Sequence, residues 1–183
     1  WSPPSDACEL TLDPNTANRR LSLSEENRKV TRRKEKQLYP DHPERFDYWP
    51  HVLCREGLSG RCYWEAEWSG EEVHIAVTYK GISRRGRGYD CVLGDNNNSW
   101  SLKCSDYRHT AWHNNERTDI HVPPSSPHRV GVYLDWLAGT LSFYTVSSDT
   151  LTHLHTFQST FTEPLYPGFR VEFDSSVSLC QVE

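Results

Sequence analysis

Side chains able to transfer protons or hold metals are plentiful in this chain, which has nine His and 25 Asp and Glu residues. His153 and His155 are two residues apart, a spacing at which one face of a strand can present two metal ligands. No third ligand is near them in the sequence, so an exposed polar face explains the pair more simply. The sequence also lacks the G-x-S-x-G, H-E-x-x-H and Walker lysine motifs. We therefore expect no catalytic residue, no metal and no cofactor.

A glycine-rich segment at residues 81–88 carries arginines between its glycines. It lacks the Gly-Lys-Ser/Thr end of a phosphate-binding loop, so a nucleotide cradle is not expected. A loop of solvated arginines and a loop that binds a protein both fit this composition. Arg84 and Arg85 could also act with His74 as donors to an anionic ligand.

The charge balance restricts the class of partner. The chain has 183 residues, with 20 Lys and Arg against 25 Asp and Glu, a formal net charge of −5. Mild acidity argues against duplex nucleic acid, which needs a basic face to neutralise its phosphates. A basic run at residues 28–36 could suggest RNA or anionic lipid, but acidic residues interrupt it, so a solvated strand-and-turn face fits better. No apolar run approaches the ~20 residues of a membrane span.

Length and composition indicate one folded domain. A chain of this size can bury roughly 70% of its unfolded surface, and its seven Trp are anchors that a disordered chain would lack. Met is absent even from position 1, which indicates a piece of a longer protein.

Six cysteines occupy positions 8, 54, 62, 91, 104 and 180, with irregular spacing and no C-x-x-C pair. Cys62 alternates with Trp64, and Cys104 follows Leu102 at period two, which places both thiols in a core. Free cysteines commonly pack as small hydrophobes, so we expect buried thiols in a reducing compartment. Disulfides are the less favoured alternative.

Alternating apolar and polar residues predict strands, and long helical periodicity is absent. Residues 61–68 alternate cleanly, and Val73, Ile75 and Val77 repeat the pattern. Turns at Asn114-Asn115 and Ala138-Gly139 suit tight hairpins. Short strands separated by regular turn signals predict an all-β antiparallel sandwich.

Five ordered blocks of sequence resemble the signature of the B30.2 (PRY–SPRY) domain family. They span about residues 7–183, and the chain is most similar to fish copies of the domain, as in tripartite-motif ubiquitin ligases, NOD-like receptors and stonustoxin-type pore-forming proteins. Two blocks depart from the family pattern, with Ala66 for a valine and Leu137 for an acidic residue. The blocks are Leu12-Asp13-Pro14 with Asn15-Thr16-Ala17, Trp64-Glu65-Ala66-Glu67, Leu134-Asp135-Trp136, Gly139-Thr140-Leu141-Ser142-Phe143-Tyr144 and Pro164-Leu165-Tyr166-Pro167-Gly168-Phe169.

The resemblance implies a bent two-sheet antiparallel β-sandwich of the SPRY, concanavalin-like jelly-roll type. Residues 1–6 would be a linker, about 7–60 the PRY part and about 61–183 the SPRY part of a single B30.2 domain. It also implies a non-catalytic recognition module whose partners bind variable loops and the exposed face of one sheet. The matching loops are residues 37–50, 79–91, 107–117 and 147–163.

The candidate partner contacts are of two kinds. Alternation places His74 and Lys103 opposite core residues, where related domains contact partners, although a lone His on a sheet face is more often simply solvated. Aromatic residues in polar loops desolvate large areas at low entropy cost, although they could also fold back onto the sandwich. The candidates are Tyr48, Trp49, His74, Arg84, Lys103, Ser105, Tyr107, Trp112 and His113.

The function implied by the resemblance is recognition of a protein target by the C-terminal domain of a cytoplasmic tripartite-motif ubiquitin ligase in innate immunity. One alternative is the C-terminal domain of a secreted, stonustoxin-like pore-forming toxin. Another is a sensor of a small anionic ligand. We expect no nucleic-acid partner, and oligomerisation through parts of the parent protein outside this chain.

Overall fold

The computed structural model describes residues 6–148 and 150–182, and this part of the chain is built almost entirely from strands. Most of the expected linker, residues 1–5, lies outside the described residues, as does Asp149 in the expected loop 147–163. One short 3-10 helix spans Tyr89–Cys91 within the described part. The strands are β1 Leu21–Ser24, β2 Lys29–Arg32, β3 His51–Leu53, β4 Arg61–Ser69, β5 Val73–Tyr79, β6 Ser99–Cys104, β7 Arg108–His113, β8 Glu116–His121, β9 Arg129–Asp135, β10 Thr140–Val146, β11 Leu151–Gln158, β12 Leu165–Val171 and β13 Ser176–Leu179.

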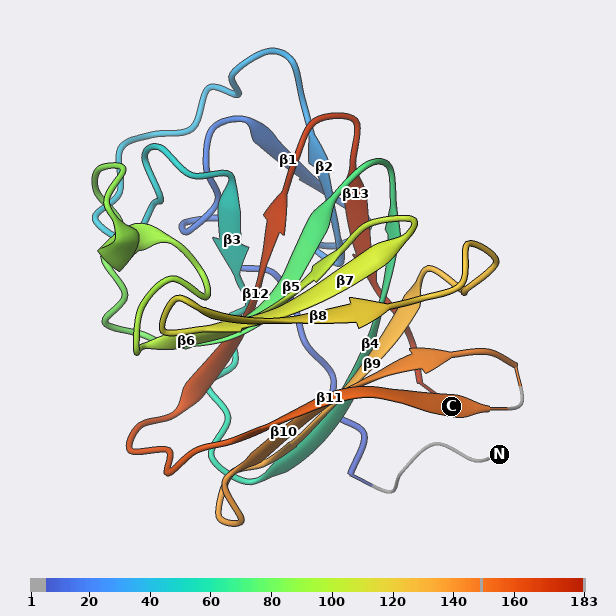
Figure 1. Cartoon of the computed structure of the whole chain (residues 1–183). Helices are drawn as coiled ribbons and strands as arrows, with labels where there is room; N and C mark the ends of the chain where they lie inside the picture. Colours follow the sequence, from blue (N-terminus) through green and yellow to red (C-terminus); the bar gives the residue numbers. More distant parts are fainter. Residues whose placement is uncertain (1–5, 149, 183) are drawn as a thin grey trace.

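Two antiparallel sheets form the layers of a sandwich (Figure 1). The seven-stranded sheet has the order β1-β2-β13-β4-β9-β10-β11, and the six-stranded sheet has the order β3-β12-β5-β6-β7-β8. Several neighbours are far apart in sequence, such as β13 beside β4 and β12 beside β5. The predicted all-β, two-sheet sandwich is confirmed.

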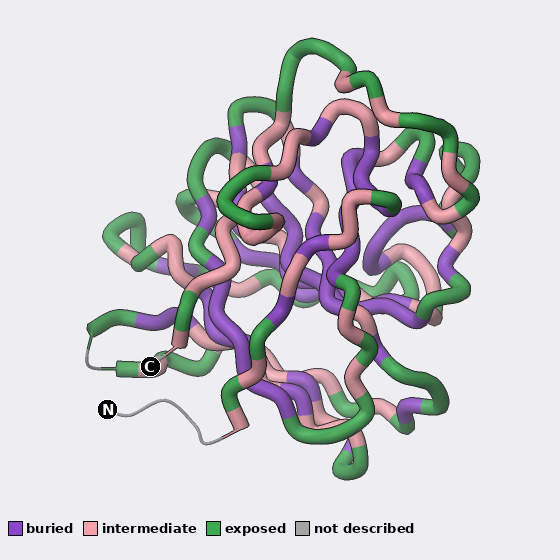
Figure 2. The backbone as a smooth tube through the Cα atoms, turned by 180° about the vertical axis from the view of Figure 1, so that it is seen from behind, coloured by how far each residue is buried: buried purple, intermediate pink, exposed green. Residues whose placement is uncertain are grey.

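The core lies between the sheets and follows the alternation in the sequence (Figure 2). From β4, Cys62, Trp64 and Trp68 point into it, and β5 contributes Val73, Ile75 and Val77. Inward side chains alternate with outward ones because successive residues of a strand point to opposite faces. The outward face of β4 is only partly solvated, since Tyr63 and Glu65 are also buried whereas Glu67 is exposed.

Two predicted hairpin turns are present. Asn114 and Asn115 join β7 to β8 with φ of 49° and 64°, and Gly139 lies between β9 and β10 with φ of 77°. The turn between β1 and β2 gave no such signal, because Glu25 and Glu26 are unusual residues for the positive φ values of 54° and 59° that they adopt. Asn27 completes that turn with φ of 62°, and its carbonyl accepts a hydrogen bond from Leu12 N at 2.8 Å.

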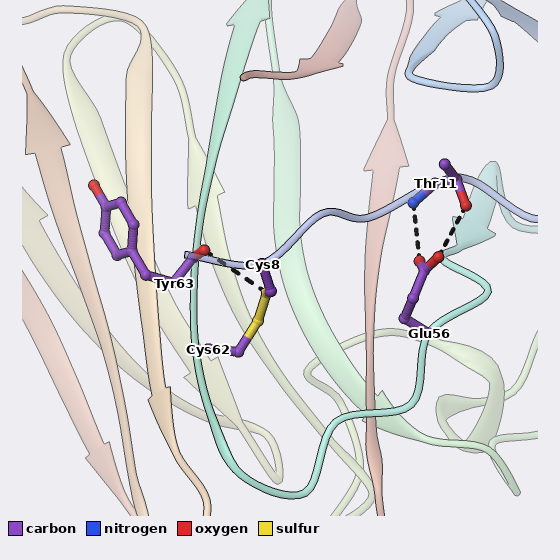
Figure 3. The surroundings of a disulfide bond; sticks show 5 residues. All are labelled: Cys8, Thr11, Glu56, Cys62 and Tyr63. Carbon is purple, nitrogen blue, oxygen red and sulfur yellow. Dashed lines mark hydrogen bonds between the residues drawn. A yellow bond between two sulfur atoms is a disulfide. The ribbon is translucent and has the colours of Figure 1, made fainter. Parts of the chain in front are cut away.

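Cys8 and Cys62 form a disulfide, with their Cα atoms 5.6 Å apart (Figure 3). The expectation of a free thiol at these two positions is therefore wrong, although Cys62 is buried in the core as predicted. This pairing depends on the tertiary structure. Cys8 and Cys62 are 54 residues apart in the sequence, and a bridge between Ala7 and Tyr63 brings their segments together. Buried free thiols are confirmed at Cys54, Cys91 and Cys104, and a half-buried one at Cys180.

Hydrogen bonds also secure the N-terminal segment beside the disulfide. The Thr11 backbone N and side-chain Oγ1 each lie 2.9 Å from an oxygen of Glu56, as Figure 3 shows. The first described residues therefore pack against β4 and the segment that precedes it.

Three of the expected loops contain regular structure, and one of them, residues 79–91, includes the 3-10 helix Tyr89–Cys91. Residues 107–117 form β7 and the start of β8, and residues 147–163 contain β11. Residues 37–50 have no strand, but Arg45 and Phe46 within them are buried. Arg45 donates to the carbonyls of Pro14 and Ala17, each at 2.8 Å, which holds this segment on the sandwich.

Candidate functional site

The outer face of the six-stranded sheet carries two adjacent rows of side chains, which we call the outer polar face. Residues opposite each other on neighbouring strands point to the same side of a sheet, so the strand register assigns each row. In the second row, Gly168 and Ala76 contribute no polar side chain to this face. The first row is His51, Arg170, His74, Lys103, Thr110 and Asp119, and the second continues through Ser101, Trp112 and Arg117.

His74 lies at the centre of the first row and is held by a carboxylate. Its Nε2 lies 3.0 Å from Glu72 Oε2, and Glu72 Oε1 lies 3.5 Å from Lys103 Nζ. Burial lowers the pKa of His74, and the Glu72 hydrogen bond opposes that effect. The same hydrogen bond lowers the pKa of Glu72 to about 2. His74 is thus a neutral, buried donor to a carboxylate, with 3% of its surface exposed, rather than a solvated side chain.

Trp49 covers the end of the row at β3. The Arg170 guanidinium lies 4.7 Å from the centre of the Trp49 ring, and Arg170 Nε lies 2.6 Å from Glu172 Oε1. His51 is fully buried between Phe46 and Trp49, with ring centroids 4.9 and 6.4 Å away. Burial, with the nearby Arg170 and His74, holds the pKa of His51 well below its usual range.

At the opposite end, a hollow opens over β6, β7 and β8. Four predicted contacts line it, namely Lys103, Ser105, Tyr107 and Trp112. Tyr107 is largely exposed, and the Arg117 guanidinium lies 5.0 Å from the centre of the Trp112 ring. This end therefore combines exposed aromatic area with charges of both signs, since Asp119 also lines it.

Several buried polar atoms on this face have no hydrogen-bond partner within the described residues. They include Ser101 Oγ, Trp112 Nε1, Trp49 Nε1 and both ring nitrogens of His51. Buried polar groups are normally paired. Unpaired atoms are not confined to this face, because Trp64 Nε1, Trp68 Nε1 and both ring nitrogens of His109 also lack a partner among the described residues.

The remaining candidates, Arg84, His113 and Tyr48, belong to neither row of the outer polar face. Arg84 donates to the carbonyls of Glu44, Lys80 and Ile82 and packs on Phe46, so it joins two loops. His113 stacks on Trp100 at 4.5 Å, on the side of the sheet opposite Trp112. Tyr48 is half exposed beside Trp49, with ring centroids 5.2 Å apart.

The residues that link the candidates, mainly His51, Arg170 and Glu72, were not predicted from the sequence. Arg170 offered a signal, because it is charged and lies between the buried Phe169 and Val171. His51 offered none, since its position depends on the pairing of β3 with β12.

The structure gives no support for metal chemistry at the histidine pair. His153 Nε2 lies 2.7 Å from Thr156 Oγ1, and His155 packs on Phe157 with ring centroids 4.5 Å apart. Among the described residues, no group of three His, Cys, Asp or Glu side chains is arranged to hold a metal ion. The described residues also include no helix long and apolar enough to cross a membrane.

A rigid β-sandwich that presents a broad polar face bordered by loops defines a recognition domain. Family comparison agrees with this class: the SPRY-associated domain (PRY) matches residues 10–58, and the SPRY domain matches residues 61–181. The chain belongs to the B30.2 (PRY–SPRY) family, whose SPRY domains are non-catalytic modules of protein interaction.

Two groups of curated relatives are similar to this chain. Stonustoxin subunit beta of Synanceia horrida is 47% identical over 165 residues, which cover 90% of this chain and 23% of the toxin subunit. Tripartite motif-containing protein 16 of Mus musculus is 41% identical over 165 residues, covering 89% of this chain and 29% of that protein. The chain thus spans about a quarter of the length of these relatives.

Solved structures represent the same two groups. The stonustoxin structure has a TM-score of 0.87 at 45% identity, and the match covers 95% of this chain and 27% of the stonustoxin chain. The crystal structure of the TRIM65 PSpry domain has a TM-score of 0.87 at 30% identity and covers 96% and 91% respectively. Both structures therefore match the fold of this chain equally well by TM-score.

Proposed function

We propose that this chain recognises a protein target through the outer polar face. The observation that supports this most is the hollow over β6, β7 and β8, where the exposed ring of Tyr107 accompanies Lys103 and Asp119. A partner would meet charged groups of both signs there, and a hydrogen bond to a charged group contributes about 1.5–3 kcal/mol. The ring of Tyr107 would add apolar area to the same contact.

The proposed mechanism is geometric. Strand pairing fixes Lys103, Thr110 and Asp119 in one row, so a target meets a rigid pattern of charges and hydroxyls. Rigid presentation reduces the entropy lost on binding. Other domains of the parent protein would then act on the bound target.

The parent that we propose is a cytoplasmic tripartite-motif ubiquitin ligase of innate immunity, with this chain as its substrate-recognition domain. The similarity to tripartite motif-containing protein 16 supports this assignment. The domain itself would carry no ligase activity. Purified domain should transfer no ubiquitin unless ligase domains are added.

Affinity capture from host-cell lysate tests the recognition function. We expect the wild-type domain to enrich protein targets that a Lys103→Ala, Trp112→Ala variant does not. The matched control is Leu137→Ala, because Leu137 is exposed on the β9–β10 turn, away from this face. Equal capture by the double variant, with both variants folded, would exclude the outer polar face as the binding site.

A toxin domain is the second candidate, and two observations favour it. Stonustoxin subunit beta is 47% identical to this chain, and the Cys8–Cys62 disulfide is of a kind that persists in oxidising compartments. The sequence that precedes this domain in the full-length protein discriminates the candidates. A RING, B-box and coiled coil would support the ligase, whereas a long pore-forming region would support the toxin.

A further inference from the structure

A second hollow adjoins the outer polar face on the side of Trp49. It lies between β2, the end of β12 and residues 47–50, and it has a volume of about 410 Å³. We call it the basic groove and define it by Arg19, Arg20, Arg32, Lys36, Trp49 and Arg170. Arg170 and Trp49 belong to both sites, so one ligand could extend from one to the other.

The groove concentrates positive charge in a chain whose net charge is −5. Five cationic residues line it, and the acidic residues among its lining are Asp47 and Glu172. Glu172 is shared, since its oxygens lie 2.6 Å from Arg170 Nε and 3.9 Å from Arg32 Nη1. One carboxylate therefore balances two guanidinium groups.

The other cations of the groove are partly unbalanced as well. Arg19 is paired with the exposed Asp41 at 2.5 Å. Within the described residues, Arg20 and Lys36 have no ion-pair partner, and Arg20 instead donates to the Lys34 carbonyl at 2.6 Å. Burial and the nearby Arg20 and Arg170 lower the pKa of Arg32, consistent with repulsion among these cations.

Arg32 and Trp49 line the groove, and each has a buried donor without an acceptor among the described residues, namely Arg32 Nε and Trp49 Nε1. The Arg32 guanidinium is fixed 4.2 Å from the centre of the Phe173 ring, so it cannot readily turn to water. Because both unpaired atoms are N–H donors, only a group with acceptor atoms could pair with them. Exposed rings of Tyr48 and Phe173 stand beside them, with 50% and 62% of their surfaces accessible.

We propose that the basic groove binds an extended acidic segment of the protein target, with carboxylates on the cations and an apolar side chain against the exposed rings. This inference rests on the proposed recognition function and names the chemistry of its partner. Carboxylates match guanidinium groups with paired, charge-assisted hydrogen bonds. A peptide fits better than bare phosphate because the groove has aromatic as well as cationic walls.

Titration calorimetry with a blocked peptide of sequence Glu-Glu-Glu-Phe-Glu-Glu-Glu tests the proposal. We expect saturable binding that weakens as salt rises, because exposed charges are screened. An Arg20→Glu, Lys36→Glu variant should bind at least tenfold more weakly. The matched control is Arg33→Glu, Lys34→Glu, which makes the same change in net charge at exposed residues outside the groove lining and should bind like wild type.

Trp49→Phe tests the role of the unpaired donor separately, because it keeps a ring and removes Nε1. We expect about threefold to tenfold weaker binding, as for one lost hydrogen bond. The glutamine version of the peptide should not bind. Absence of saturable binding by the acidic peptide, or equal weakening in both charge-reversal variants, would overturn the proposal.

Other anions provide the competing outcomes. Tighter binding of inorganic phosphate, of single-stranded RNA or of phosphatidylserine vesicles, lost in the Arg20→Glu, Lys36→Glu variant, would assign the groove to that ligand and overturn the acidic segment. Capture through Lys103 and Trp112 reports on the recognition function independently. If capture persists while the peptide fails to bind, only the proposal for the groove is contradicted. If the peptide binds while capture is absent, the proposed recognition function is contradicted.

Discussion

His74 and Glu72 share a hydrogen bond of 3.0 Å at the start of β5, on the outer side of the sheet. The imidazole is buried, whereas the carboxylate is only partly so and also lies near Lys103. The bond requires the proton of neutral His74 to be on Nε2, and it gives the first row of the outer polar face a fixed pattern of donors and acceptors. This hydrogen bond fixes the orientation of the His74 imidazole.

Stability should fall as the pH decreases from about 7 to 5. Burial lowers the pKa values of His51, His74 and His109 below their usual value of 6.5. Below that pH, the unfolded chain binds protons that the folded chain cannot, so protonation favours unfolding. Denaturant titrations at several pH values measure this slope. His51→Phe should make it shallower, and an unchanged slope would show that His51 is not the neutral buried group described here.

A second loss of stability should occur below pH 4.5. The pKa of Glu72 is lowered from 4.5 to about 2, so its contribution is complete above 4.5 and disappears as the pH falls toward 2. Glu72→Gln should remove this part of the pH dependence. Glu71→Gln is the control, because Glu71 is exposed and should leave the profile as it is.

Loss of the Cys8–Cys62 disulfide should reduce the free energy of unfolding by about 2–4 kcal/mol, because the bond closes a long loop in the unfolded chain. Cys8→Ala should show this change in denaturant melts and should then be insensitive to reductant. Cys180→Ser is the control, since Cys180 is a free, half-buried thiol. Thiol titration in denaturant should find the four free cysteines Cys54, Cys91, Cys104 and Cys180; six reactive thiols would contradict the bond.

Glu65→Gln should destabilise the fold by about 2 kcal/mol, a value reduced from that of a fully buried pair because Arg129 is one-third exposed. Glu65 is 3% exposed and lies 2.6 Å from Arg129 Nε and 2.7 Å from the Tyr63 hydroxyl. Glu67→Gln, at an exposed position two residues further along the same face of β4, should change stability by less than about 0.5 kcal/mol. Similar melts for both variants would show that the buried pair does not stabilise β4.

Gly139→Ala should destabilise the β9–β10 hairpin by more than about 1 kcal/mol. Gly139 has φ of 77°, and an added Cβ would lie 2.1 Å from the Ser159 carbonyl oxygen. Gly60→Ala is the matched control, because nothing lies within 4 Å of its Cβ position. Thermal melts compare the two, and an equal change in both would contradict the steric argument.

The strands and the core could be predicted from local pattern. Cys62, Trp64 and Trp68 alternate with polar residues, and that period of two is a property of the backbone itself. The hairpin turns at Asn114-Asn115 and Gly139 were predictable for a similar reason, because few residues adopt positive φ readily. The β1–β2 turn escaped prediction because Glu25 and Glu26 adopt positive φ against their preference.

The candidate site was predicted only in part. His74 and Lys103 could be placed on an outward face by alternation alone. His113 looked equivalent to Trp112 as an aromatic group in a polar segment, yet it stacks on Trp100 on the other side of the sheet. Arg84 looked like a free loop cation, but backbone carbonyls of two loops bind it.

By itself, the sequence determined the all-β class, the inward residues of most strands and the family, since each depends on residues close together in the chain. Only the tertiary structure decided that Cys8 meets Cys62, that Arg170 lies between His51 and His74, and that Arg32 and Lys36 share a groove with Trp49. The physical reason is that strands β3, β12 and β5 are neighbours in space but not in sequence, so their register follows from packing of the whole sandwich.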